Sequence, residues 1–109
     1  MLECVNKIGA SPFLIGGTGN DNNGKKLRLY IKQKNIKSFL INSKGSVTTN
    51  KIRFFSNYES LLRIDDESIF KINKKKNIEL KKKVINKIKS SDIVVVSDYG
   101  KGFCKNTIL

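Results

Sequence analysis

Histidine is absent from the 109 residues, and the chain contains only two cysteines and one proline. The cysteines, Cys4 and Cys104, lie near opposite ends of the sequence and form no Cys-x-x-Cys pair. Structural zinc sites are built from closely spaced cysteines and histidines. The sequence therefore excludes such a site, and we expect two reduced thiols and no bound metal.

Long hydrophobic runs are also lacking. The longest, residues 93–96, is Ile-Val-Val-Val, whereas a membrane-spanning helix needs about 20 apolar residues. The first residues show no basic stretch followed by an apolar one, so no signal peptide is predicted. An apolar content of 39% fits one small globular domain. We expect a cytoplasmic protein with no membrane partner.

Acidic residues are few: the chain has nine Asp and Glu and 22 Lys and Arg, which gives a net charge of +13. All but three of the basic residues are lysines. Nucleic-acid-binding proteins favour arginine for base and phosphate contacts and aromatic residues for stacking. The lysine runs at 74–76 and 81–83 contain neither. We therefore expect a solvated lysine face and no nucleic-acid partner, and a basic nucleic-acid-binding module is the alternative.

The hydrophobic pattern predicts helices and strands in alternation. The first half is expected to contain the tail of a helix over 2–9, a strand at 13–15 running into glycines, a helix over 23–34 capped by Asn20 or Asp21, and a strand at 39–41. The second half is expected to contain a hairpin over 47–65, a loop over 66–77 and a helix over 78–90. A strand at 93–96, covered on both faces, and a helix beginning near Lys105 follow. This order predicts an α/β layered fold with mostly parallel strands and an antiparallel hairpin. The pattern starts and stops inside an element, so we expect exposed sheet edges and poor solubility for the chain alone.

The hairpin carries the first group of candidate site residues. Residues 47–55 and 60–65 alternate with period two around a turn at 56–58, which predicts one buried apolar face and one polar face. The polar face holds Lys51, Arg53 and Arg63, with Asp65 close by. The planar guanidinium of arginine suits a phosphate or the vicinal hydroxyls of a sugar. An ordinary solvated sheet face is the other interpretation of the same pattern.

The second group follows the predicted strand at 93–96, in the segment Ser-Asp-Tyr-Gly-Lys-Gly. Ligands of open α/β sheets bind beyond the carboxyl ends of the strands. There Asp98 could accept hydroxyl protons and Lys101 could contact a phosphate, while the alternative interpretation is a turn and a helix cap. An earlier stretch, residues 19–26, nearly matches the P-loop pattern but ends in Lys26, which has no hydroxyl for Mg²⁺. That stretch is interpreted as a strand-to-helix turn.

Four motifs, in this order, resemble ribokinase-like (PfkB-type) carbohydrate kinases. The first is the G-x-x-G-x-D-x-x-G stretch ending at Gly24. The other three are T-T-x-K-x-R at 48–53, L-x-R-x-D at 61–65 and S-D-Y-G-K-G at 97–102. The last three are similar to the kinase domain of ADP-heptose synthesis, which acts on D-glycero-beta-D-manno-heptose 7-phosphate. The resemblance covers residues 1–109 and implies a partial ribokinase-like domain, truncated at both ends.

The resemblance implies an ATP- and Mg²⁺-dependent kinase that phosphorylates C1 of heptose 7-phosphate for ADP-heptose and lipopolysaccharide core synthesis, and that forms a homodimer when complete. The substrate-binding residues it implies are Lys51, Arg53, Arg63, Asp65, Asp98, Tyr99 and Lys101. The family's catalytic base belongs to a G-A-G-D motif that these 109 residues do not contain. We therefore expect the chain alone to be inactive and to bind no cofactor. A PfkB-type kinase for another sugar, or a non-catalytic remnant that serves as an interaction domain, are the remaining alternatives.

Overall fold

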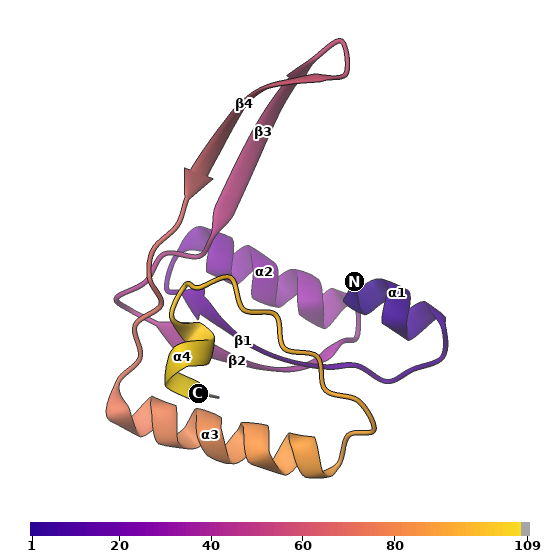
Figure 1. Ribbon diagram of the computed structural model, residues 1–109, viewed down its shortest axis with the longest axis vertical. Coiled ribbons are helices and arrows are strands. Elements are labelled where there is room, and N and C mark those ends of the chain that lie inside the picture. The colour runs from indigo at the N-terminus through magenta and orange to yellow at the C-terminus, as the bar shows by residue number, and fades with distance from the viewer. Residues whose placement is uncertain (108–109) are drawn as a thin grey trace.

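The computed structural model describes residues 1–107 as a mixed α/β fold, as predicted. Its elements, in chain order, are α1 (Leu2–Lys7), β1 (Phe13–Gly19), α2 (Asn22–Gln33), β2 (Lys37–Ser43), β3 (Asn50–Ser56), β4 (Glu59–Asp66), α3 (Lys74–Lys89) and α4 (Phe103–Thr107). Figure 1 shows a small α/β body from which the β3–β4 hairpin projects. Among the described residues, no helix has both the length and the apolar character needed to cross a bilayer.

The body is built on the parallel pair β1 and β2, joined through α2. Strands β1 and β2 pair from Phe13 with Lys37 to Gly19 with Ser43, so their carboxyl ends lie together. Helices α2 and α3 lie on opposite sides of the pair (Figure 1). The buried hydrophobic residues of these layers, among the described ones, are Ile31, Ile36, Ile41 and Leu80, and Cys104 is buried on α4. This core is small for a chain of this length, so each buried side chain carries a large share of the stability.

Helix α2 begins where the sequence indicated. Asp21 has extended backbone angles, and its side chain accepts a hydrogen bond from the Gly24 amide, which is the geometry of an N-cap. Helix α3, by contrast, begins four residues earlier than predicted, so the expected loop over 66–77 is too long. The Asn73 side chain caps α3 by accepting from the Lys76 amide, and the lysine run 74–76 forms its first turn because lysine is a good helix former.

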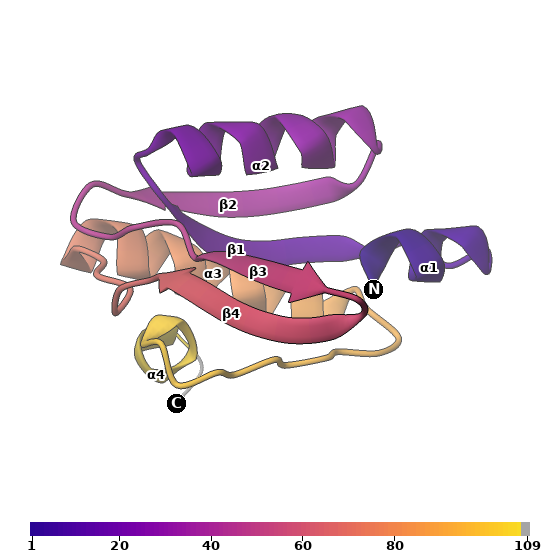
Figure 2. The same cartoon turned by 90° about the horizontal axis from the view of Figure 1, so that it is seen from above.

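The hairpin has the predicted strands and turn. Asn57 and Tyr58 adopt positive φ angles of 49° and 67°, as a two-residue turn of type I′ requires. The prediction of a buried apolar face is wrong, since Ile52, Phe54 and Leu62 are 44%, 46% and 55% exposed. The strands pair with each other and project away from the body (Figures 1 and 2). No layer of the described chain covers their apolar side.

The predicted strand at 93–96 does not form, and this is the largest departure from expectation. Residues 93–96 belong to no strand, and their side chains are 51–81% exposed. A strand needs a neighbour for its backbone hydrogen bonds, and β1 pairs only with β2 in the described chain. Figure 2 shows the segment after α3 passing the body without joining the sheet. Helix α4 then begins at Phe103, two residues before the predicted start.

Candidate functional site

The polar face of the hairpin holds four of the predicted site residues together. In the β3–β4 register, Lys51 lies opposite Asp65 and Arg53 lies opposite Arg63. Directly opposite residues of an antiparallel pair point to the same face, so all four side chains share one surface. The Arg63 Nε lies 2.9 Å from an Asp65 carboxylate oxygen, and the Arg63 side chain is 50% exposed. This ion pair orients the guanidinium while leaving it open to solvent.

The segment that follows β4 holds Lys101 close to the polar face of the hairpin. Glu67 directly follows β4, and its carboxylate lies 2.7 Å from the Lys101 Nζ. This hydrogen bond, reinforced by the positive charges of Lys101, Lys51 and Arg63, lowers the pKa of Glu67 from its ordinary value. Three residues further on, the Phe70 amide donates to the Lys101 carbonyl at 2.7 Å. The segment 97–102 is thus fastened to the base of the hairpin.

These contacts define one group, which we call the charged cluster: Lys51, Arg53, Arg63, Asp65, Glu67 and Lys101. Its four basic side chains outnumber its two carboxylates. The charge excess favours an anionic ligand, and the carboxylates add acceptors for hydroxyl groups. Such a surface can hold a small molecule that combines a phosphate with several hydroxyls.

The structure does not bring Asp98 and Tyr99 into the charged cluster. The Asp98 side chain accepts from the Gly100 amide at 2.9 Å, and Gly100 has a φ of +70°. Asp98 therefore stabilises a turn, which is the alternative interpretation of this segment. Its negative charge also adds to burial in raising the pKa of Cys104. Tyr99 is 83% exposed. The sequence assigns both residues to ligand binding, and that assignment stays a prediction.

Two further features were missed by sequence reasoning. Glu67 lies just beyond the L-x-R-x-D motif, and no pattern in the sequence signals that it pairs with a lysine 34 residues away. Thr18 is 1% exposed and accepts from the Arg28 guanidinium at 2.5 Å. Arg28, the third arginine of the chain, therefore ties α2 to β1 rather than contributing to the charged cluster.

The P-loop-like stretch forms no cradle for phosphate. Lys25 and Lys26 belong to helix α2, and the space next to Gly19 and Gly24 is filled by Asp21 and Thr48. This supports its interpretation as a structural turn. On α3, Lys83 lies over the Phe13 and Phe39 rings, so part of the lysine face makes internal contacts.

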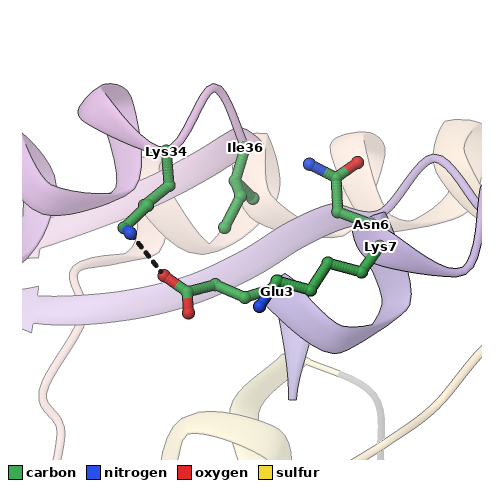
Figure 3. Close-up of a pocket in the computed structure, with 5 residues that line it drawn as sticks. All are labelled: Glu3, Asn6, Lys7, Lys34 and Ile36. Carbon is green, nitrogen blue, oxygen red and sulfur yellow. Dashed lines mark ion pairs between the residues drawn. The ribbon is translucent and has the colours of Figure 1, made fainter.

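Two pockets lie elsewhere, between α1 and α2. Figure 3 shows the smaller, of about 240 Å³, where the Glu3 carboxylate pairs with Lys34 at 3.2 Å. The larger, of about 430 Å³, is mostly apolar and opens over Leu14 and Leu40. None of the predicted site residues lines either pocket. The charged cluster, which holds four of the predicted residues and Lys101, is therefore the better candidate site.

The charged cluster lies beside the carboxyl end of the parallel strands, where ligands of open α/β sheets bind. Comparison with known proteins shows which proteins the chain resembles. No family model matches the chain. It is 33% identical over 102 residues to an uncharacterized sugar kinase of Buchnera aphidicola, covering 94% of this chain and 32% of that protein.

The chain is also similar to the bifunctional protein HldE of several bacteria. It is 36% identical over 98 residues to HldE of Campylobacter jejuni, covering 90% of this chain and 20% of that protein. With HldE of Hyphomonas neptunium it shares 30% identity over 103 residues, which cover 94% of this chain and 21% of that protein. The chain is therefore related to a segment of these proteins, and it spans about a fifth of their length. These matches confirm the resemblance expected from the four motifs.

Proposed function

We propose that this chain supplies the sugar-phosphate-binding hairpin of an ATP-dependent carbohydrate kinase. The substrate we infer is D-glycero-D-manno-heptose 7-phosphate, phosphorylated at C1 for ADP-heptose and lipopolysaccharide core synthesis. The observation that carries the proposal is the charged cluster, which the segment 97–102 joins through Lys101. The named relatives, sugar kinase and HldE, support the same reaction class.

In this proposal Glu67 holds Lys101 in place through their ion pair, and the other members of the charged cluster contact the ligand. Arg63 and Arg53 lie opposite each other and offer planar donors to the 7-phosphate. Lys51 adds a point charge next to them. Asp65 orients Arg63 and accepts from a sugar hydroxyl. Lys101 neutralises charge at the edge of the cluster, and Asp98 and Tyr99 extend the binding surface along the same segment.

The transfer step needs groups that we do not assign to this chain. In the reaction, ATP supplies the phosphoryl group and Mg²⁺ neutralises its charge. Among residues 1–107, no three carboxylate, imidazole or thiol groups gather closely enough to hold a metal ion. We infer that the chain alone binds sugar phosphate without transferring phosphate, and that the complete kinase is a cytoplasmic homodimer.

The binding role is tested by calorimetric titration of the chain with heptose 7-phosphate and with free heptose. We expect the phosphorylated sugar to bind more tightly, and Arg63→Ala to raise its Kd by about tenfold through loss of a charge-assisted contact. The matched control is Lys82→Ala, which removes the same charge from an exposed position on α3. In a full-length relative, we expect alanine at the position aligned with Arg63 to raise KM for the sugar phosphate.

Equal effects of Arg63→Ala and Lys82→Ala would contradict the assignment, as would an unchanged kcat/KM in the relative. If the chain instead binds a DNA oligonucleotide with an affinity that falls steeply as salt rises, the basic nucleic-acid-binding alternative is correct.

A further inference from the structure

The segment that leads into β3 is fastened to the end of β1 by Asp21. One carboxylate oxygen of Asp21 accepts from the Thr48 hydroxyl at 2.6 Å and from the Gly24 amide at 2.8 Å. The other oxygen accepts from the Thr48 amide at 2.8 Å. The Thr48 hydroxyl in turn accepts from the Gly19 amide at 2.8 Å. Four hydrogen bonds thus join the end of β1, the start of α2 and the segment before β3.

Two glycines make this approach possible. A Cβ at Gly19 would meet the Ser46 carbonyl and lie 2.7 Å from the Thr48 amide nitrogen. A Cβ at Gly24 would meet the Gly19 carbonyl and lie 2.9 Å from the Thr48 hydroxyl. Any larger residue at either position would push Thr48 away from Asp21. We call Gly19, Asp21, Gly24 and Thr48 the hairpin anchor.

The anchor lies where the direction of the hairpin is decided. In the described chain, strands β3 and β4 pair with each other, and neither packs extensively against another helix or strand. A projecting hairpin can turn only about its base. The entering side of that base is held by Thr48, which is 7% exposed. The leaving side is held by the Lys71 amide, which donates to the Ser46 hydroxyl, and by Lys101.

We propose that Asp21 and Thr48 are positioning residues, which fix the angle of the hairpin and so keep Lys51 and Arg63 close to Lys101. Neither residue touches a ligand in this account. The inference rests on the hydrogen bonds of the hairpin base and holds for any ligand of the charged cluster. Its failure is therefore distinguishable from failure of the proposed function.

The test measures the orientation of the hairpin directly. Spin labels are placed at Tyr58→Cys, on the fully exposed turn, and at Lys32→Cys, on the exposed side of α2. The background carries Cys4→Ser at the exposed thiol and Cys104→Ala at the buried one. Pulsed electron resonance then gives the distribution of distances between the two labels. Thr48→Val keeps the shape of the side chain but removes the hydroxyl. We expect it to broaden the distribution about twofold.

Two controls separate positioning from general damage. Thr49→Val makes the same chemical change at the exposed neighbouring position, and we expect an unchanged distribution. Thr48→Ser restores the hydroxyl and should restore the narrow distribution. Amide exchange at Gly19 should accelerate on the order of tenfold in Thr48→Val while the amides of α2 keep their protection.

A Thr48→Val distribution as narrow as that of the original chain would overturn the proposal. If Thr48→Val loses its helical circular dichroism, the same distance is measured in Asp21→Asn, in which the amide group cannot accept at both positions. A narrow distribution there would also overturn the proposal, and a broad one with intact dichroism would support it.

Discussion

Leu80 on α3 is the residue whose loss should cost the fold most. Its side chain is 0% exposed, and α3 packs against β2. Replacing a buried leucine by alanine costs about 2–5 kcal/mol, because the transfer free energy of the methyl groups is lost and a cavity remains. A domain of this size has about 5–15 kcal/mol of stability in total. Leu80→Ala should therefore remove a large share of the free energy of unfolding, about 3 kcal/mol.

The assay is urea denaturation followed by circular dichroism. A loss of about 3 kcal/mol, at a slope of about 1.5 kcal/mol per molar urea, lowers the midpoint by about 2 M. The matched control is Ile85→Ala on the same helix, where the side chain is 52% exposed, and its cost should stay below about 1 kcal/mol. Equal midpoints for the two variants would refute the assignment of the core to this face of α3.

Two further predictions concern the cysteines and the pH dependence. A thiol reagent such as DTNB should modify Cys4 rapidly, because Cys4 is exposed. It should modify Cys104 slowly, because burial, and to a smaller extent the charge of Asp98, raises the pKa of the Cys104 thiol. Equal rates for the two thiols would contradict the packing of α4. Hydrogen bonds lower the pKa of Asp21 and of Glu67 from ordinary values of 3.8 and 4.5, so both carboxylates stabilise the fold above these values and lose that contribution as the pH falls through their lower folded-state pKa. The urea midpoint should therefore hold to about pH 5 and fall at lower pH, and a midpoint unchanged down to about pH 3 would show that neither contact stabilises the fold.

Local patterns in the sequence predicted most elements of the fold. The Asn-Asp stretch followed by glycine indicated the start of α2, since a short polar side chain caps a helix through nearby amides. Period-two alternation indicated the hairpin and put Arg63 and Asp65 on one face. The start of α3 was missed because three lysines in a row look like a polar loop, although one asparagine before them suffices as a cap.

The remaining features depend on contacts between distant residues. The run at 93–96 has the composition of a buried strand, but composition does not supply the neighbour that a strand requires. Asp21 and Thr48 are 27 residues apart, and Glu67 and Lys101 are 34 apart. No spacing rule joins residues at such separations. The sequence could therefore indicate which side chains share one face of the hairpin, but not that Lys101 lies next to that face.

Helix α1 differs from the rest of the body in how it is held. It buries no residue, and its recorded side-chain contacts with α2 are the Tyr30 hydroxyl donating to Glu3 and the pairing of Lys34 with the same carboxylate. Elements held by exposed polar contacts open at a small fraction of the free energy of global unfolding. Both pockets take one wall from α1, so they exist only while α1 is docked. Any molecule bound there would hold α1 against the body and would therefore slow proteolysis at the amino-terminal end of the chain.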